Sequence, residues 1–211
     1  MKIAKILEVL QTELPNWEVP AAKGCAYAYE RTPYTILISV MLSYKTKDEI
    51  TCKAANRLLS FANTPQKIAA LSVETIADRI KGVGFYNQKA RQIKRMSLEL
   101  LERFGGVVPS TLEELTSLPG VGVKAAKIVL EKAYDQPVVA VDSHVHRILN
   151  RWGVVHTRNA LQTDRELEKL LPDEMKRGFN RTLVAFGQAI CKPLKPDCEV
   201  CPIKDLVECS T

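Results

Sequence analysis

Apolar side chains recur along this chain three and four residues apart, the spacing that gathers them on one face of an α-helix. The first fourteen residues follow it, with apolar side chains at Ile3, Ile6, Leu7, Leu10 and Leu14. Residues 34–42 are apolar on nearly every side, so periodicity cannot separate a buried helix from a buried strand there. We expect a helix, because the segments that follow are helical and no partner strand is evident. With no convincing alternating strand elsewhere, the predicted fold class is all-α.

Helix-start signals divide the rest of the chain into short helices. Thr46 with Glu49, and Thr163 with Glu166, have the spacing of a capping box, so each pair predicts a helix start. Residues 176–190 carry one apolar side and predict a single amphipathic helix. The other predicted starts are Thr64, Ser72, Thr111 and Asp142.

The stretch Leu118–Lys127, with the sequence LPGVGVKAAK, predicts a tight corner between two helices. An alanine-rich helix over 123–132 would point the backbone N–H groups of Val121 to Lys124 outward, as a site for an anion. This helix-hairpin-helix pattern is typical of sequence-independent binding to DNA phosphates. An ordinary tight turn between helices is the alternative. The predicted phosphate contacts are Gly120, Val121 and Gly122.

A second Gly-Val-Gly corner comes earlier in the chain. Gly82 and Gly84 form it, Phe85 follows, and a strongly basic helix then runs to Gly105-Gly106. The two corners, each followed by a basic helix, do not amount to a repeat. The basic side chains of the helix after the second corner are Lys89, Arg91, Lys94, Arg95 and Arg103.

Composition and charge narrow the class of protein. The chain has 211 residues, 46% of them hydrophobic, which suffices for one large or two small folded domains. Its net charge of +6 favours a polyanionic partner. No apolar run reaches the length of a membrane span, and acidic residues interrupt the N-terminal helix, unlike a signal peptide. We therefore expect a soluble, cytoplasmic protein without a targeting signal.

Lys124 and Asp142 are candidates for chemistry if the fold brings them to one site. A lysine nucleophile must be neutral, and the positive end of a helix dipole in the first helical turn disfavours an ammonium. Asp142 would serve as a proton acceptor or as a counter-charge to a cationic transition state. Taken alone, each residue has an ordinary explanation, as a surface charge and as a helix cap. The three histidines are assigned no catalytic role.

Four of the six cysteines crowd into the last 21 residues and predict a metal site. Four thiolates suit a structural zinc ion or an iron–sulfur cluster, and a single Cys-x-x-Cys pair favours the cluster. Cys25 and Cys52 stand apart and are expected to be free thiols. Lys192 and Lys195 would offer charge to a second phosphate segment. The candidate ligands are Cys191, Cys198, Cys201 and Cys209.

These motifs together closely resemble the endonuclease III family of the helix-hairpin-helix DNA glycosylase superfamily. The resemblance covers almost the whole chain and is strongest over LPGVGVKAA from Leu118, over 139–151, which begins VAVDSHVHR, and over 187–201. It implies that Lys124 is a Schiff-base nucleophile, that Asp142 is its acidic partner, and that the four cysteines hold a [4Fe–4S] cluster. It also implies a six-helix barrel over 31–136 and a discontinuous iron–sulfur domain made of 1–30 and 137–211.

The chain departs from the family pattern at three positions. The family usually places its fourth cysteine where this chain has Val207, and Cys209 comes two residues later. Lys45 stands where many relatives have a glutamine that fills the space of the extruded base. Phe85 stands where relatives often have leucine, so an aromatic wedge would fill the base stack. The expected DNA contacts therefore include Lys45, Gly82, Gly84 and Phe85.

The resemblance implies a monomeric, nucleoid-associated enzyme acting on double-stranded DNA that contains damaged bases or abasic sites. It would excise oxidised pyrimidines through a lysine Schiff base and cut the strand 3′ to the abasic site by β-elimination. Mismatch-type glycosylases for thymine or adenine are the alternatives within the superfamily, although they normally lack the lysine at the Lys124 position. A non-enzymatic DNA-binding module is the alternative from another class.

Overall fold

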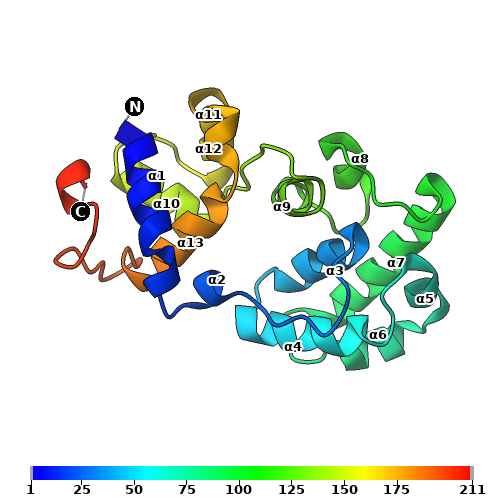
Figure 1. Ribbon diagram of the computed structural model, residues 1–211. Helices are drawn as coiled ribbons and strands as arrows, with labels where there is room; N and C mark the ends of the chain where they lie inside the picture. Colours follow the sequence, from blue (N-terminus) through cyan, green and yellow to red (C-terminus); the bar gives the residue numbers. More distant parts are fainter. Residues whose placement is uncertain (1, 210–211) are drawn as a thin grey trace. The chain divides into compact units, whose positions relative to one another are not determined.

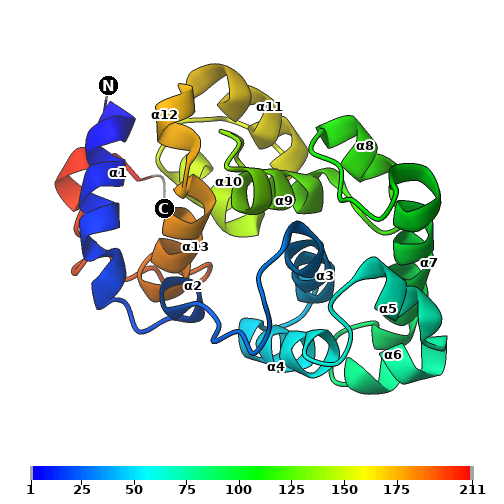
Figure 2. The ribbon, with the colours of Figure 1, turned by 45° about the vertical axis from the view of Figure 1, so that its right-hand side comes forward.

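The computed structural model describes residues 2–209, and the regular structure within that range is entirely helical (Figures 1 and 2). The all-α prediction is therefore confirmed. The chain divides into two compact units. The central unit comprises residues 25–136, and the terminal unit combines the residues up to Gly24 with those from Pro137 onward. The resemblance placed the boundaries at residues 31 and 137, whereas the division by contacts places the first at Cys25.

The central unit is organised around α3, a helix that is buried along most of its length. This helix packs against α4, α7 and α9, as both ribbon views show (Figures 1 and 2). The expected helix over 34–42 is confirmed. The bounds are α3 Pro33–Ser43, α4 Asp48–Leu59, α5 Pro65–Ala70, α6 Val73–Arg79, α7 Tyr86–Phe104, α8 Leu112–Ser117 and α9 Val123–Tyr134. The six-helix barrel remains a prediction.

Hydroxyl caps start three helices of the central unit as predicted. The side chains of Thr64, Ser72 and Thr111 accept hydrogen bonds from the backbone N–H groups three residues later. The capping box at Thr46 was wrong, because α4 begins after Lys47 and has no side-chain cap. The Thr46 hydroxyl instead accepts a hydrogen bond from the backbone N–H of Gly84.

The terminal unit packs around α13, which contacts α1, α2 and α10 (Figures 1 and 2). Phe186 lies at its centre, with the rings of Trp17 and Trp152 each 5.9 Å from its ring centroid. The bounds are α1 Lys2–Glu13, η1 Leu14–Asn16, α2 Pro20–Lys23, α10 Ser143–Arg151, α11 Ala160–Leu170, α12 Asp173–Lys176, α13 Phe179–Ala189 and η2 Lys204–Leu206.

Two predictions in the terminal unit were wrong. Asn159, not Thr163, caps α11, and the buried Thr163 hydroxyl contacts His146 Nδ1 at 2.7 Å instead. The single helix expected over 176–190 is interrupted, because Gly178 adopts a left-handed conformation (φ 69°) and separates α12 from α13. The amphipathic pattern of the sequence runs across Gly178, and therefore did not reveal that this glycine breaks the helix.

The expectation of free thiols at Cys25 and Cys52 was also wrong, because the two form a disulfide with a Cα–Cα distance of 5.8 Å. The segment before α3 runs beside α4, where the Asn56 side chain accepts from the N–H of Ala28 and donates to the carbonyl of Ala26. This contact brings two cysteines that are distant in sequence to one place. Within residues 2–209, no helix combines the length and apolar character that a membrane span requires.

Candidate functional site

The corner at Gly120 connects α8 to α9. Gly120 has φ 78°, a left-handed conformation that glycine adopts at little cost, and Gly122 is the residue that caps α9. The N–H of Val121 donates to the carbonyl of Leu118 at 3.2 Å, so its expected outward direction was wrong: the corner itself uses this group. The start of α9 retains the orientation of N–H groups and dipole that attracts an anion.

The corner at Phe85 lies against a second turn. We call residues 82–85 the Phe85 corner and residues 43–46, closed by a Thr46 N–H to Ser43 carbonyl bond, the Lys45 turn. Lys45 and Phe85 both have left-handed backbones, with φ 49° and 58°, although neither is a glycine. The Lys45 ammonium lies 5.5 Å from the centre of the Phe85 ring, within cation–π range.

Gly84 joins the two turns closely. A Cβ atom at this position would lie 2.5 Å from the carbonyl oxygen of Lys45, so only glycine fits. Gly82 differs, because its φ of 99° favours glycine, whereas a Cβ atom there would meet only the Ile50 side chain, at an ordinary contact distance of 3.9 Å. Tyr44 and Phe85 project from this joined structure with 64% and 58% of their surfaces exposed. An exposed aromatic ring on a rigid turn is suited to insertion between stacked bases.

One pocket of about 540 Å³ in the central unit brings together residues from three predicted segments. Its lining includes Lys45 and Phe85 from the two joined turns, and Gly120, Gly122 and Lys124 from the helix-hairpin-helix. The pocket therefore places a primary amine among the predicted DNA contacts. Gly82, Gly84 and Val121 are not part of this lining.

Lys124 is the second residue of α9, and its side chain is exposed. Its position in the first turn of α9, directly after the Gly120–Gly122 corner, follows from the sequence, since α9 begins at Val123 as expected. A lysine at this place can reach a ligand in the pocket, and an amine can form an imine with a sugar carbon.

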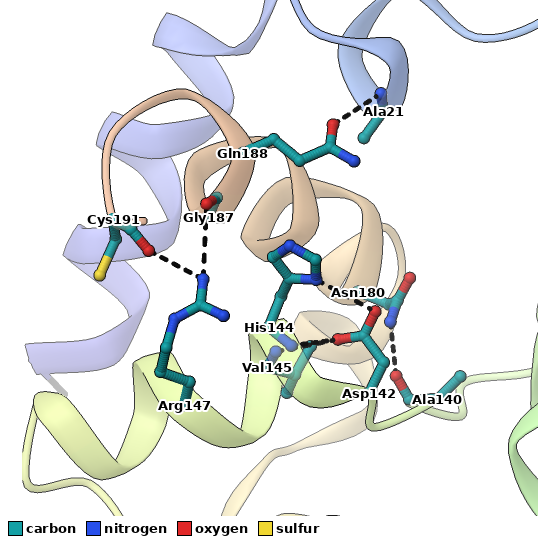
Figure 3. A network of polar contacts seen from close by, with 10 residues as sticks. All are labelled: Ala21, Ala140, Asp142, His144, Val145, Arg147, Asn180, Gly187, Gln188 and Cys191. Carbon is teal, nitrogen blue, oxygen red and sulfur yellow. Dashed lines mark hydrogen bonds and ion pairs between the residues drawn. The ribbon is translucent and has the colours of Figure 1, made fainter. Parts of the chain in front are cut away.

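Asp142 lies in the terminal unit and caps α10, as predicted (Figure 3). Its Oδ1 atom accepts from the N–H groups of His144 and Val145 at 2.9 and 3.0 Å. Its Oδ2 atom lies 3.7 Å from His144 Nδ1, and 13% of the side chain is exposed. Asn180 donates to the carbonyl of Ala140 at 2.6 Å and so fixes the segment before the cap. The carboxylate is oriented, and part of its surface remains accessible.

Two arginines on α10 reach the cysteine-rich segment (Figure 3 shows the first). Arg147 donates to the carbonyl oxygen of Cys191 at 2.8 Å, and burial lowers the pKa of its guanidinium. Arg151 donates to the carbonyls of Lys192 and Pro193 at 2.7 and 2.6 Å, and to Cys191 Sγ at 3.4 Å. The helix capped by Asp142 thus also holds the start of the cysteine segment in place.

All four predicted cysteine ligands line one cavity of about 220 Å³ in the terminal unit, Cys209 included. Burial raises the pKa of Cys201 and of Cys209, and the neighbouring thiols raise it by a smaller amount. Four thiols around a single cavity are a donor set that fits an iron–sulfur cluster. In residues 2–209, no His, Cys, Asp or Glu side chains form a group of three or more arranged to hold a single metal ion. Lys192 and Lys195 are exposed in the same segment.

Lys89 lines the pocket, and the sequence analysis named it only among the basic side chains of its helix. Only 4% of it is exposed, and its ammonium donates to oxygen atoms of the Lys45 turn and of α3. A signal was present, because Lys89 lies on the same helical stripe as the buried Ile93, Met96 and Leu100.

Comparison with known proteins identifies two regions of the chain. Residues 38–173 match the model of the HhH-GPD superfamily base excision DNA repair protein. Residues 191–206 match the iron-sulfur binding domain of endonuclease III. The second match includes three of the four cysteines and ends before Cys209.

Individual relatives agree with these matches. Endonuclease III of Thermotoga maritima is 47% identical over 179 residues, which cover 85% of this chain and 84% of the relative. Endonuclease III of Escherichia coli (strain K12) is 38% identical over 208 residues, or 99% and 97% of the two chains. A solved structure of a trapped endonuclease III–DNA covalent intermediate superposes with a TM-score of 0.86 at 30% identity, covering 98% of this chain and 95% of the other.

Proposed function

Because this chain belongs to the endonuclease III family of HhH-GPD base excision DNA repair proteins, we propose that Lys124 and Asp142 perform its chemistry. The family membership makes the protein a DNA-binding glycosylase with AP lyase activity that carries a [4Fe–4S] cluster. The observation that supports Lys124 is the pocket in which its amine lies among Gly120, Gly122, Lys45 and Phe85.

The proposed substrate is an oxidised pyrimidine flipped out of double-stranded DNA. Damage weakens stacking and pairing, so extrusion of such a base costs less than extrusion of an intact one. Phe85 would fill the vacated stack, and the N-terminus of α9 behind Gly120 and Gly122 would bind a backbone phosphate. A trapped covalent complex with DNA is the state described for the related endonuclease III, and it motivates a covalent mechanism here.

The proposed reaction begins with attack of the neutral Lys124 amine on C1′ of the flipped nucleotide. The nitrogen–carbon bond forms as the glycosidic bond breaks, and the base leaves as an anion with the bonding electrons and takes a proton from water. Asp142 accepts the proton that the lysine nitrogen loses and balances cationic character on the sugar. The sugar then opens to an imine, which acidifies C2′. Loss of a C2′ proton expels the 3′ phosphate oxygen and cuts the strand.

Cys191, Cys198, Cys201 and Cys209 are the proposed ligands of the cluster. The cavity that they line supports Cys209 as the fourth ligand despite its shift of two residues from the family pattern. When bound, the cluster supplies a cross-link between four thiolates. Arg147 and Arg151 would hold the segment around it, since both donate hydrogen bonds to its first residues. We further propose that the protein acts as a monomer in the cytoplasm.

The assignment of Lys124 is tested by borohydride trapping on a duplex that contains thymine glycol. Lys124→Ala should abolish the covalent adduct yet keep DNA affinity within about fivefold, since an exposed charge contributes about 1 kcal/mol or less. Lys132→Ala, at the other end of α9, is the matched control and should trap like the parent protein. An adduct that survives Lys124→Ala would refute the assignment.

Asp142→Asn separates catalysis from capping, because asparagine caps a helix about as well as aspartate. We expect unchanged thermal stability and a base-release rate lower by about 100-fold, a typical contribution of a positioned proton acceptor. Parallel assays on G:T and A:8-oxoguanine duplexes distinguish the mismatch-type alternatives. Binding of every duplex without release of any base would favour the non-enzymatic module.

A further inference from the structure

Lys89 has no part in the proposed reaction, although it lines the same pocket as Lys124. It lies in the first turn of α7 and is 4% exposed, which is rare for a lysine. Its ammonium donates to the carbonyl oxygens of Leu42 and Tyr44 at 2.7 and 2.6 Å, and lies 3.3 Å from Thr46 Oγ1. An ammonium has three N–H donors, so these three oxygens account for all of them.

Those acceptors mark the end of α3. The last carbonyl groups of a helix lack partners within the helix and carry partial negative charge, which a cation satisfies. Leu42 belongs to the last turn of α3 and Tyr44 is its C-cap residue. The Lys89 ammonium therefore supplies the bonds and the charge that close this helix, and does so at the first residues of the Lys45 turn.

The same contacts join the Lys45 turn to the Phe85 corner. Thr46 Oγ1 receives both the Lys89 ammonium and the Gly84 N–H, at 3.3 and 3.1 Å. Left-handed backbone at two non-glycine residues costs free energy and persists only where neighbouring contacts impose it. Lys45 and Phe85 are both in that state. The ammonium thus lies at the junction of both strained turns.

A role as a second nucleophile conflicts with this geometry. Attack requires a neutral amine with its lone pair directed at the substrate, whereas the Lys89 nitrogen is surrounded by three oxygen acceptors. Lys124 is exposed, in contrast. The two lysines of the pocket therefore differ in burial.

We infer that Lys89 is a positioning residue whose buried ammonium locks the Lys45 turn to the Phe85 corner and so aims Lys45 and Phe85 at the DNA base stack. This role rests on the proposed function in one respect, the contact of Lys45 and Phe85 with DNA. It is independent of the chemistry at Lys124. It concerns how the opposite strand and the vacated stack are held.

The protonation of Lys89 provides one readout. Burial lowers the pKa of its ammonium from the usual 10.5 to about 8. As the pH rises through about 8, the charge and one of the three N–H donors are lost, so the lock weakens in alkaline solution. The titratable groups near it are Tyr44, whose ring centre lies 6.0 Å from the ammonium, and Lys45 and Lys124, which line the same pocket.

The test compares Lys89→Met with Lys94→Met. Methionine keeps a linear side chain of similar length but has no donor. Lys94 is a matched control on the same helix, because its ammonium also donates to the carbonyl at a helix end, that of Leu71, at 2.6 Å and outside the pocket. The probe is a duplex with a tetrahydrofuran abasic analogue and 2-aminopurine opposite it, whose fluorescence rises when the base is unstacked.

Lys89→Met should lose most of the fluorescence rise and bind the probe about tenfold more weakly, the loss of one well-placed contact. Its binding should also lose the weakening that we expect of the parent protein above pH 8. Borohydride trapping on an abasic duplex, at enzyme concentrations that saturate binding, should remain within about threefold of the parent, because Lys124 is intact. Lys94→Met should match the parent in every measurement on DNA.

Parent-like fluorescence and affinity in Lys89→Met would overturn the inference. So would a loss of trapping at saturation, which would place Lys89 in the chemistry. The probe reports binding alone, so a parent protein that fails to trap would refute the proposed function without deciding this test. If Lys89→Met does not fold, Thr46→Val serves instead. It removes the oxygen shared by Lys89 and Gly84, and the same loss of fluorescence is expected from it, whereas a parent-like signal would contradict the lock.

Discussion

The two corners of the central unit have the same tripeptide, Gly-Val-Gly, but differ in the atoms that surround it. At the Phe85 corner, the second glycine lies against the backbone of the Lys45 turn, with 2.5 Å between its Cβ position and a carbonyl oxygen. At the Gly120 corner, the second glycine has no atom within 4 Å of the same position. Other atoms of the protein occupy the space beside the second glycine of the Phe85 corner, whereas the space beside the second glycine of the Gly120 corner is empty.

This difference separates two uses of glycine that one sequence pattern cannot distinguish. Gly84 permits two parts of the chain to approach each other, so that Phe85 and Lys45 are held rigidly. Gly122 leaves space at the N-terminus of α9, where a phosphate from outside the protein can approach the backbone. One corner builds the wedge, and the other provides the surface on which DNA rests.

Gly84→Ala should have the largest effect on stability. The new methyl group meets a backbone carbonyl that cannot move by side-chain rotation. We expect a loss of about 3 kcal/mol in the free energy of unfolding, at the upper end for an overpacked site. Urea denaturation followed by circular dichroism measures it. A loss below about 0.5 kcal/mol, the range of an ordinary surface change, would show that the corner is not packed as described.

Gly120→Ala should have an intermediate effect. A residue with a Cβ atom at φ 78° costs about 1 to 2 kcal/mol, and the Gln92 side chain, 3.0 Å from the new methyl, must also rotate away. The same denaturation experiment checks this. Gln92→Ala should reduce the cost in the double variant, but only by the part that Gln92 contributes. Complete recovery would mean that crowding, rather than backbone conformation, explains the glycine.

Gly122→Ala should have the smallest effect on stability. Its φ of −92° suits any residue, and the poorer cap offered by alanine is offset by the lower entropy of the unfolded chain. The expected change is within about 0.5 kcal/mol. Affinity for an abasic duplex should nevertheless fall by about tenfold, because the methyl group occupies the approach of the phosphate. Fluorescence anisotropy decides this, and unchanged affinity would contradict the phosphate contact.

Local signals were sufficient for much of the fold. Thr64, Ser72, Thr111 and Asp142 were recognised as caps because a cap bonds to the N–H groups two or three residues later, well within a short window. The all-α class and the start of α9 followed from periodicity and glycine in the same way. These features depend on residues that are close together in the sequence, so a single sequence suffices to predict them.

Three of the wrong predictions concern side chains recruited by distant residues. Thr46 has the spacing of a cap, but its hydroxyl bonds to the N–H of Gly84, 38 residues away. Thr163 contacts His146, 17 residues away. The disulfide between Cys25 and Cys52 spans 27 residues. Such contacts depend on how helices pack, which capping rules do not include.

In the candidate site, too, local features were predicted and contacts between distant residues were not. Lys124 and the open glycine corner were predicted from one decapeptide. The pocket that adds Lys45 and Phe85 to them required the packing of α3, α7 and α9. Lys89 was named only among the basic side chains of its helix, although its place on the buried stripe of α7 distinguishes it from them.

The disulfide also determines how the Lys45 turn can be cut. Cys25 and Cys52 close a covalent ring that contains all of α3, the Lys45 turn and the first turn of α4. Trypsin acting after the exposed Lys45 would break the chain at the turn itself. Both pieces would still be joined through sulfur, so the nicked protein would migrate as one species on a non-reducing gel and as two fragments after reduction.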